Sequence, residues 1–294
     1  MNADSVDLVL QGPGLSPEAV RQFESLLAPE ATLRRGSAAR LRGVREDASA
    51  RQSAAALARA WDCDLAFVPS GLRRADFRAI AFDVDSTLVT IEGIDELARM
   101  AGKGEEVARI TEAAMRGEIA DYAQSLRRRA ALLAGAPASI LQRVLEEKLR
   151  LSPGAQALLA SAREAGWRTL LVSGGFTYFT RALQERLAID VSCANELVTR
   201  EGTLTGEVRG SPEDGGRIVD AAGKTRALER LCATIPCPTG AAIAVGDGAN
   251  DLGMMAIAGL SVAYRAKPAV RARASVAIDH CGLDAIDGLF YDAW

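Results

Sequence analysis

The residues with the clearest capacity for chemistry are Asp83 and Asp85, two carboxylates separated by one residue. They follow the apolar segment 79–82, whose β-branched and aromatic residues are typical of a buried strand. In a parallel α/β sheet the carboxyl ends of the strands open into the ligand crevice. The position therefore favours a catalytic or metal-binding pair, although acidic pairs are also common in turns and helix caps.

Two later segments, residues 169–172 and 241–245, have the same character, because each is apolar and strand-like and each runs into polar residues or glycine. A lysine lies between them. If the three segments are parallel strands of one sheet, the groups that follow them meet at one edge. The residues concerned are Ser173, Gly174, Gly175, Lys224, Asp247, Asn250 and Asp251.

In order and residue type, these segments resemble the four motifs of the haloacid dehalogenase superfamily of phosphotransferases, most closely those of its phosphoserine phosphatases. The motifs are Asp-x-Asp-Ser-Thr-Leu, Ser-Gly-Gly-Phe, a lysine, and Gly-Asp-Gly-Ala-Asn-Asp. The resemblance covers roughly residues 78–275, and the combination is far more specific than any single motif. It implies hydrolysis of O-phospho-L-serine to L-serine and phosphate, in serine biosynthesis.

The resemblance also implies an α/β fold, with a Rossmann-like core around a parallel sheet and a helical cap inserted after the first core strand. Apolar residues keep helical spacing through residues 91–150, which are expected to form this cap. Residues 73–90 and 151–294 are expected to form the core. Residues 197–206 indicate a hairpin that turns at Glu201-Gly202 and is expected to form a second small flap.

Residues 1–72 are expected to form a separate small α+β domain. Their pattern predicts the order β-α-β-β-α-β, a split βαβ unit, with Ser16 and Pro17 at the start of the first helix. In some phosphoserine phosphatases such a unit precedes the catalytic domain and is similar to the amino-acid-sensing ACT domains. A packing or dimerisation unit without a ligand is an equally good interpretation.

The aspartates of the motifs would concentrate negative charge at one edge of the sheet, which requires a cation. Carboxylate oxygens without histidine or thiolate favour Mg²⁺. By resemblance, Asp83 and Asp247 supply side-chain ligands and Asp85 supplies a backbone carbonyl. Asp251 would support the metal shell, also by resemblance, whereas a helix cap formed by Asn250 and Asp251 is the alternative.

In the mechanism that the resemblance implies, Asp83 attacks phosphorus and forms an aspartyl-phosphate. Asp85 protonates the leaving oxygen and then takes a proton from the water that hydrolyses this intermediate. Lys224, Ser173 and the Gly174 amide bind the phosphate oxygens. A solvated helix position is the alternative for Lys224, but its 23-residue interval to the last acidic motif is typical of the family.

Phosphoserine carries an ammonium group and a carboxylate, so its pocket needs an acid and an arginine. By resemblance, Glu92 binds the ammonium group, Arg129 binds the carboxylate and Asn250 reaches the substrate. Tyr122 stands where many relatives carry phenylalanine. The two arginines that precede Arg129 are interpreted as a solvated helix face.

Composition narrows the functional class further. A net charge of −3 without a polybasic segment argues against nucleic acid as a partner. No long apolar segment or secretory signal is visible, so we expect a cytoplasmic protein without membrane association. Five cysteines without a Cys-x-x-Cys motif are expected to be reduced thiols, and a single histidine argues against a histidine-rich zinc site. A homodimer through the N-terminal domain is an open alternative.

Three other functions stay open at this point. The same core could pass phosphate to another alcohol such as homoserine, as a related enzyme does, or act on a different small phosphomonoester. A non-enzymatic amino-acid sensor built on residues 6–70 is the third. With every catalytic position filled, the phosphatase is the preferred interpretation.

Overall fold

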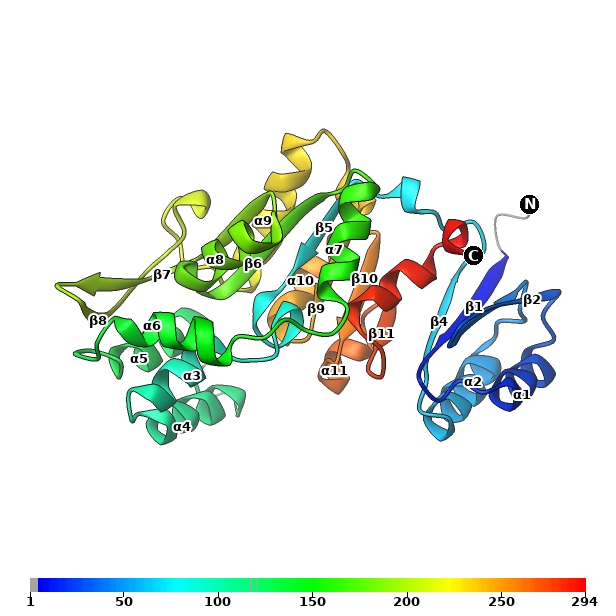
Figure 1. The fold of residues 1–294 in the computed structure, drawn as a ribbon, viewed down its shortest axis with the longest axis horizontal. Coiled ribbons are helices and arrows are strands. Elements are labelled where there is room, and N and C mark those ends of the chain that lie inside the picture. Colours follow the sequence, from blue (N-terminus) through cyan, green and yellow to red (C-terminus); the bar gives the residue numbers. More distant parts are fainter. Residues whose placement is uncertain (1–4, 117, 120) are drawn as a thin grey trace.

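The computed structural model describes residues 5–116, 118–119 and 121–294, and these residues form two sheets (Figure 1). The strands of the larger sheet are β5 (Ala79–Phe82), β6 (Arg168–Phe176), β7 (Val191–Arg200), β8 (Thr203–Arg209), β9 (Ala242–Gly246), β10 (Leu260–Tyr264) and β11 (Val276–Ile278). Their order is β11-β10-β9-β5-β6-β7-β8, and every neighbouring pair is parallel except β7 and β8. The first strand of the core therefore lies at the centre of the sheet.

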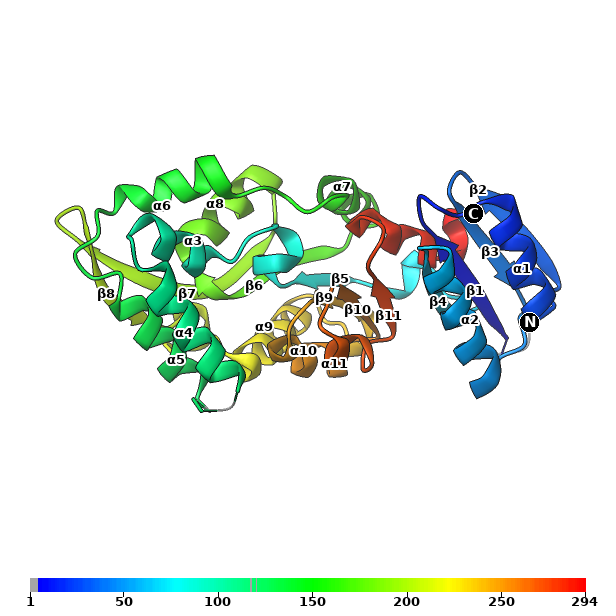
Figure 2. The same ribbon diagram turned by 90° about the horizontal axis from the view of Figure 1, so that it is seen from below.

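Helices cover both faces of this sheet, as its fully buried central strands β5, β9 and β10 require. In β5, Ile80 and Phe82 belong to one buried cluster, whereas Ala79 and Ala81 belong to the cluster on the opposite face. Figure 2 shows α7 and α8 on one side and α9, α10 and α11 on the other. The helices are α7 (Ala155–Glu164), α8 (Thr177–Leu187), α9 (Ala221–Thr234), α10 (Leu252–Ile257) and α11 (Pro268–Arg271). The core is thus a three-layer α/β structure.

A group of helices leaves the core directly after β5 and returns before α7. These are α3 (Gly93–Met100), α4 (Gly104–Met115), α5 (Tyr122–Ala131) and α6 (Ser139–Arg143), followed by a helical turn at Val144–Lys148. Leu97, Leu126 and Val144 are buried between them. The two connections to the core touch, because Val89 and Leu151 form an antiparallel bridge. Across the described residues, no helix has both the length and the apolar character needed to cross a bilayer.

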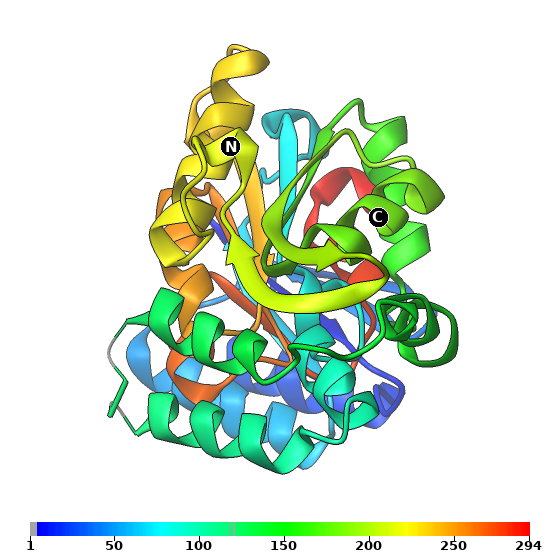
Figure 3. The same ribbon diagram turned by 90° about the vertical axis from the view of Figure 1, so that its left-hand side faces the viewer.

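The β7–β8 hairpin has the turn that the sequence predicts, since Glu201 and Gly202 both have positive φ, 48° and 77°. The hairpin also contacts the cap. The Gly135 amide donates to the Leu204 carbonyl at 2.9 Å, and the Leu204 amide donates to the Ala136 carbonyl at 2.8 Å. In Figure 3 the hairpin curves in front of the sheet, beside the cap helices. Backbone hydrogen bonds thus join cap and core at a second place.

The N-terminal residues have the predicted element order. The elements are β1 (Val6–Gln11), α1 (Pro17–Leu27), β2 (Ala31–Arg35), β3 (Ala38–Arg42), α2 (Ala48–Ala60) and β4 (Asp64–Pro69), and the antiparallel sheet has the order β2-β3-β1-β4. Ser16 caps α1 as expected, because its hydroxyl accepts from the Ala19 amide at 3.1 Å. Figure 2 shows this unit and the cap at opposite ends of the molecule.

The N-terminal sheet is joined to the core by polar contacts with the residues that follow β11. The Asp64 carboxylate accepts from the backbone amides of Asp279, His280 and Cys281 at 2.8–3.2 Å. Gln11 adds a hydrogen bond to the Ala285 carbonyl at 2.9 Å. These contacts hold the unit against the core, while the boundaries proposed at residues 72, 90 and 150 stay predictions.

Candidate active site

The site is built around a buried lysine between two carboxylates. Lys224, in the first turn of α9, is fully buried, and its Nζ lies 2.6 Å from Asp83 Oδ1 and 2.7 Å from Asp251 Oδ1. Burial by itself opposes the charged lysine, but the two carboxylates raise the pKa of Lys224 above its ordinary value. The lysine is therefore a fixed positive charge beneath the carboxyl ends of β5 and β9.

Asp251 shapes the loop that follows β9. Its Oδ2 accepts from the amides of Asp247 and Gly248 at 3.1 and 3.0 Å. A Cβ at position 246 would collide with the Asp251 carboxylate, so the glycine there is a requirement of this close approach. Asp251 is the N-cap residue of α10, but its side chain makes no capping bond to the described residues of that helix. Its carboxylate binds this loop and Lys224 instead.

Three carboxylates of the site lie close enough to share one cation. Oxygens of Asp83, Asp247 and Asp251 lie within 4.8 Å of one another. Loss of solvent raises the pKa of Asp83 and of Asp247, and the neighbouring Asp251 charge raises both further. An all-oxygen set with this excess of negative charge fits a hard divalent ion.

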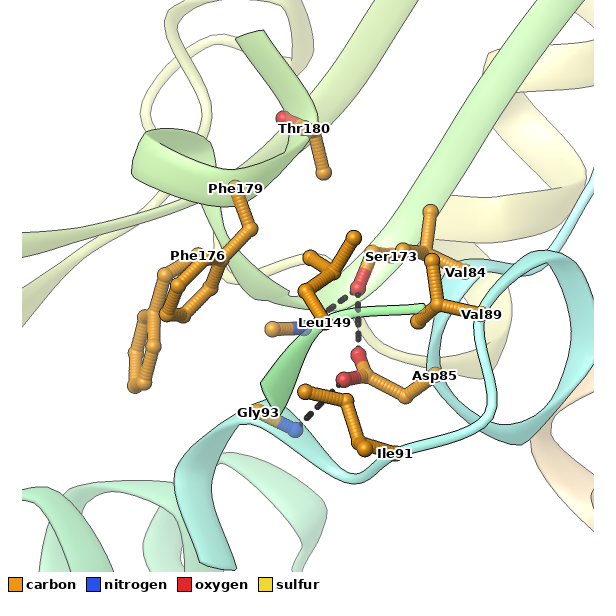
Figure 4. Close-up of a pocket in the computed structure, with 11 residues that line it drawn as sticks. Val84, Asp85, Val89, Ile91, Gly93, Leu149, Ser173, Phe176, Phe179 and Thr180 are labelled. Atoms are coloured by element: carbon orange, nitrogen blue, oxygen red, sulfur yellow. Dashed lines mark hydrogen bonds between the residues drawn. The ribbon is translucent and has the colours of Figure 1, made fainter. Parts of the chain in front are cut away.

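Asp85 has different partners from Asp83. Its Oδ1 accepts from the Gly93 amide at 2.7 Å, and its Oδ2 accepts from the Ser173 hydroxyl at 3.1 Å. Figure 4 shows this carboxyl group among apolar side chains of the small pocket behind it, including Ile91 and Leu149. Loss of solvent raises the pKa of Asp85, which favours the protonated form of its carboxyl group.

The turn after β6 holds the next motif. The Ser173 hydroxyl accepts from the Gly175 amide at 2.8 Å, and the Gly174 carbonyl accepts from the Asn195 amide group at 2.9 Å. A Cβ at Gly174 would collide with the Tyr122 hydroxyl. The glycine thus allows the cap helix α5 to approach the core.

A cavity of about 150 Å³ joins these groups to the cap. Ser173, Lys224 and Asp251 are buried against it, with at most 1% of their surface exposed. The other predicted site residues line it directly, so the structure brings the whole predicted set together. The lining residues are Asp83, Asp85, Glu92, Tyr122, Arg129, Gly174, Gly175, Asp247, Gly248, Asn250 and Lys267.

The cap contributes three of the predicted residues. The Glu92 carboxylate accepts from the Ser86 hydroxyl at 2.6 Å, and loss of solvent together with the Asp85 charge raises the pKa of Glu92 to about 7. Arg129 Nε donates to the Ser125 carbonyl at 3.4 Å, one turn earlier in α5. Burial raises the pKa of Tyr122 to about 12, so its hydroxyl stays protonated.

Sequence reasoning missed three polar residues of the site. The Thr87 hydroxyl donates to Asp247 Oδ1 at 3.3 Å, Lys267 lines the cavity, and Asn195 is fully buried beside the Gly174 turn. Lys267 could have been found, because it follows β10 and the same rule about strand ends applies. Asn195 had a weaker signal, a polar residue that follows the apolar pair Cys193 and Ala194 in β7.

A profile of the haloacid dehalogenase-like hydrolase family matches residues 80–256. The match begins in β5 and ends in α10, so it includes the three strand ends and the lysine that meet at the cavity. The chain belongs to this family and is an enzyme. The predicted α/β fold with a mostly parallel core sheet is thereby confirmed.

Several known proteins are similar to this chain over most of its length. The phosphoserine phosphatase of Polaromonas sp. is 51% identical over 215 residues, which are 73% of this chain and 90% of that protein. The unliganded probable phosphoserine phosphatase from Vibrio cholerae has a TM-score of 0.82 at 35% identity, covering 99% of this chain and 87% of that one. A structure described as a phospho-aspartyl intermediate analogue of phosphoserine phosphatase has a TM-score of 0.66 at 35% identity, over 73% of this chain and 99% of that one.

Family membership agrees with the chemistry of the cavity. Phosphatases of this family generally use a divalent metal ion, and the carboxylates of Asp83, Asp247 and Asp251 offer oxygen ligands for one. The cavity is small and lined mostly by polar residues, which suits a small charged molecule. The site therefore belongs to a hydrolase that acts on a small-molecule substrate.

Proposed function

We propose that this chain is a Mg²⁺-dependent phosphoserine phosphatase that hydrolyses O-phospho-L-serine to L-serine and phosphate. The observation that carries the proposal is the difference between two neighbouring carboxylates at one cavity. Asp83 pairs with Lys224, whereas Asp85 accepts hydrogen bonds from Ser173 and Gly93 in an apolar setting. The names of the relatives support the choice of phosphoserine. A role in cytoplasmic serine synthesis is part of the same proposal.

The metal would be held by the carboxylates of Asp83 and Asp247 and by the Asp85 carbonyl, with Asp251 behind them. When bound, Mg²⁺ would neutralise charge on the phosphate oxygens and on this acidic cluster. The choice of Mg²⁺ rests on the all-oxygen ligand set. Asp251 also holds the Asp247 amide, which fixes the loop that carries the ligand.

In the first half-reaction, an Asp83 oxygen attacks phosphorus while the bond from phosphorus to the serine oxygen breaks. Lys224 fixes the position of the Asp83 carboxylate and offers its charge to the phosphate oxygens. Ser173 and the Gly174 amide donate hydrogen bonds to the same oxygens. Asp85, kept protonated by its apolar surroundings, gives its proton to the leaving serine oxygen.

In the second half-reaction, Asp85 is ionised and takes a proton from water as that water attacks phosphorus. The bond between phosphorus and the Asp83 oxygen breaks, which releases phosphate and restores the carboxylate. The Gly93 amide, which donates to Asp85 Oδ1, stabilises the ionised form of Asp85 between the two steps. One side chain thus serves as acid and then as base.

The cap supplies groups for the rest of the substrate. Glu92 would pair with the ammonium group and Arg129 with the carboxylate. Tyr122 and Asn250 line the cavity between these ends. Lys267, at the core side of the same cavity, adds a positive charge near Asp247.

The test is phosphate release from a panel of phosphomonoesters, with Mg²⁺ and after chelation. We expect phosphoserine to be preferred over phosphoethanolamine, which lacks the carboxylate, and activity to disappear with chelator. Adding homoserine tests the transferase alternative. Equal rates on both esters, or a phosphorylated acceptor formed faster than free phosphate, would contradict the proposal.

A further inference from the structure

The turn between β5 and the cap contains an unusual backbone conformation. Ser86 has φ 57° and ψ 0°, in the left-handed region that residues other than glycine rarely adopt. Its amide donates to the Ile91 carbonyl at 3.1 Å, which holds the turn closed. Conformations of this kind persist where the surrounding structure enforces them, and they cluster at functional sites.

In this conformation the Ser86 hydroxyl reaches a cap residue. It donates to Glu92 Oε1 at 2.6 Å, a short hydrogen bond to a charged acceptor. Glu92 is the N-cap residue of α3, yet its carboxylate makes no capping bond to the described residues of that helix. The hydrogen bond from Ser86, and not a capping bond to α3, therefore fixes the orientation of the carboxylate.

The carboxylate lies in strongly negative surroundings at the cavity. Loss of solvent and the charges of Asp85, Asp247 and Asp95 all favour its neutral form, whereas the hydrogen bond from Ser86 favours the charged form. An ammonium group in the cavity would find several carboxylates around it, but it needs one in direct contact. Ser86 favours an ionised Glu92 that lines the cavity.

We propose that Ser86 is a positioning residue that orients Glu92 toward the ammonium group of the substrate and so contributes to the preference for amino-bearing phosphomonoesters. This role rests on the proposed function, because it assigns Glu92 to the ammonium group. It differs from a purely structural role in the turn. A structural role would affect Asp85, one residue earlier, and would therefore change the hydrolysis of every phosphomonoester.

The test compares phosphoserine with phosphoglycolate, which keeps a phosphate and a carboxylate but lacks the ammonium group and is one carbon shorter. For each variant, KM is measured, or Ki where turnover is too slow. In Ser86→Ala we expect KM for phosphoserine to rise about tenfold with little change in kcat, because one hydrogen bond to a charged group is lost. The constant for phosphoglycolate is expected to stay unchanged.

Two further variants separate the hydroxyl from the backbone conformation. Ser86→Gly removes the hydroxyl and tolerates positive φ, so we expect the same selective loss as in Ser86→Ala. Ser86→Asn tolerates the conformation and supplies a donor amide, so we expect partial recovery. In a Glu92→Gln background, Ser86→Ala should add little, as expected for two residues that act on one interaction.

The outcomes distinguish this role from the proposed function. Equal losses for both ligands in Ser86→Ala, with recovery in Ser86→Gly, would overturn the inference in favour of a backbone role. Unchanged constants in both variants would also overturn it. A wild-type enzyme that does not prefer phosphoserine to phosphoglycolate would instead contradict the assignment of Glu92 and the proposed function on which this role rests.

Discussion

The two walls of the active-site cavity are built in different ways. On the core side, Asp83, Ser173 and Lys224 come from strand ends or from a helix packed on the sheet, and all three are buried. Each of them has at least two polar partners within the core. On the cap side, Glu92 precedes α3 and Arg129 lies on α5, and both line the cavity, are more exposed and have fewer polar partners.

This difference indicates that the core residues bind the phosphoryl group, whereas the cap residues bind the rest of the substrate. Buried, fully bonded groups keep their geometry through the reaction, which is what electrostatic stabilisation of a phosphoryl group requires. Partly exposed groups can adjust to the rest of a substrate and can be changed without disturbing the fold. We therefore expect substitutions on the core wall to affect kcat for all substrates, and substitutions on the cap wall to affect KM for particular ones.

The largest effect is expected for Asp83→Asn. Loss of the nucleophile should lower kcat by at least about 10⁴-fold for every phosphomonoester. Burial raises the pKa of Asp83, so the folded state binds protons more tightly than the unfolded state, and ionisation near neutral pH costs stability. The variant should therefore melt at the same or a higher temperature without metal. Turnover of this variant at the wild-type rate would contradict the assignment of Asp83 as the nucleophile.

Lys224→Met should have the next largest effect. The substitution leaves Asp83 and Asp251 buried without their cation, which is expected to cost about 3–5 kcal/mol of unfolding free energy. kcat should fall by about 10²–10³-fold on all substrates. Thermal melting and steady-state kinetics measure both. Lys267→Met is the matched control, because Lys267 is exposed, and a similar loss of stability there would contradict the account.

On the cap wall, Arg129→Ala should act selectively. KM for phosphoserine is expected to rise about 10- to 100-fold, because a charge-assisted contact with the substrate carboxylate is lost. Phosphoethanolamine, which lacks that carboxylate, should be hydrolysed as before. Arg128→Ala removes an exposed neighbour on the same helix and should change neither ester. A uniform loss on both esters would assign Arg129 to the core chemistry instead.

The smallest effect is expected in the pH dependence of KM for phosphoserine. The pKa of Glu92 is raised to about 7, so its charged form increases as pH rises through this value. Between about pH 6 and pH 8, KM for phosphoserine should therefore fall relative to KM for phosphoglycolate, which has no ammonium group. Bound Mg²⁺ would shift this change to lower pH. A constant ratio over the whole range, in wild type and in Glu92→Gln alike, would remove the assignment.

The core wall could be predicted from the sequence because one rule covers it. Apolar strands that end in acids, serine or glycine meet at the carboxyl edge of a parallel sheet. The structure brings Asp83, Ser173 and Asp247 together there, and the family match supports the fold. Lys267 also lies beyond the carboxyl end of a core strand, β10. No recognisable motif surrounds it in the sequence, so the sequence did not single it out.

Other features could not be predicted because they depend on contacts between distant segments. The bond between Gly135 and Leu204 joins backbone groups, which no side-chain pattern marks. Asn195 supports the Gly174 turn only because β6 and β7 are neighbours. The conformation of Ser86 likewise follows from the closed turn, since its residue type alone favours no positive φ.

The central claim is that Asp83 carries the phosphoryl group during turnover. The most direct measurement is acid quenching of the enzyme during hydrolysis of phosphoserine, followed by peptide mapping of phosphorylated aspartate. The account predicts phosphate on Asp83 in the wild type. Full turnover with no phosphorylated aspartate, or with phosphate on another residue, would contradict it.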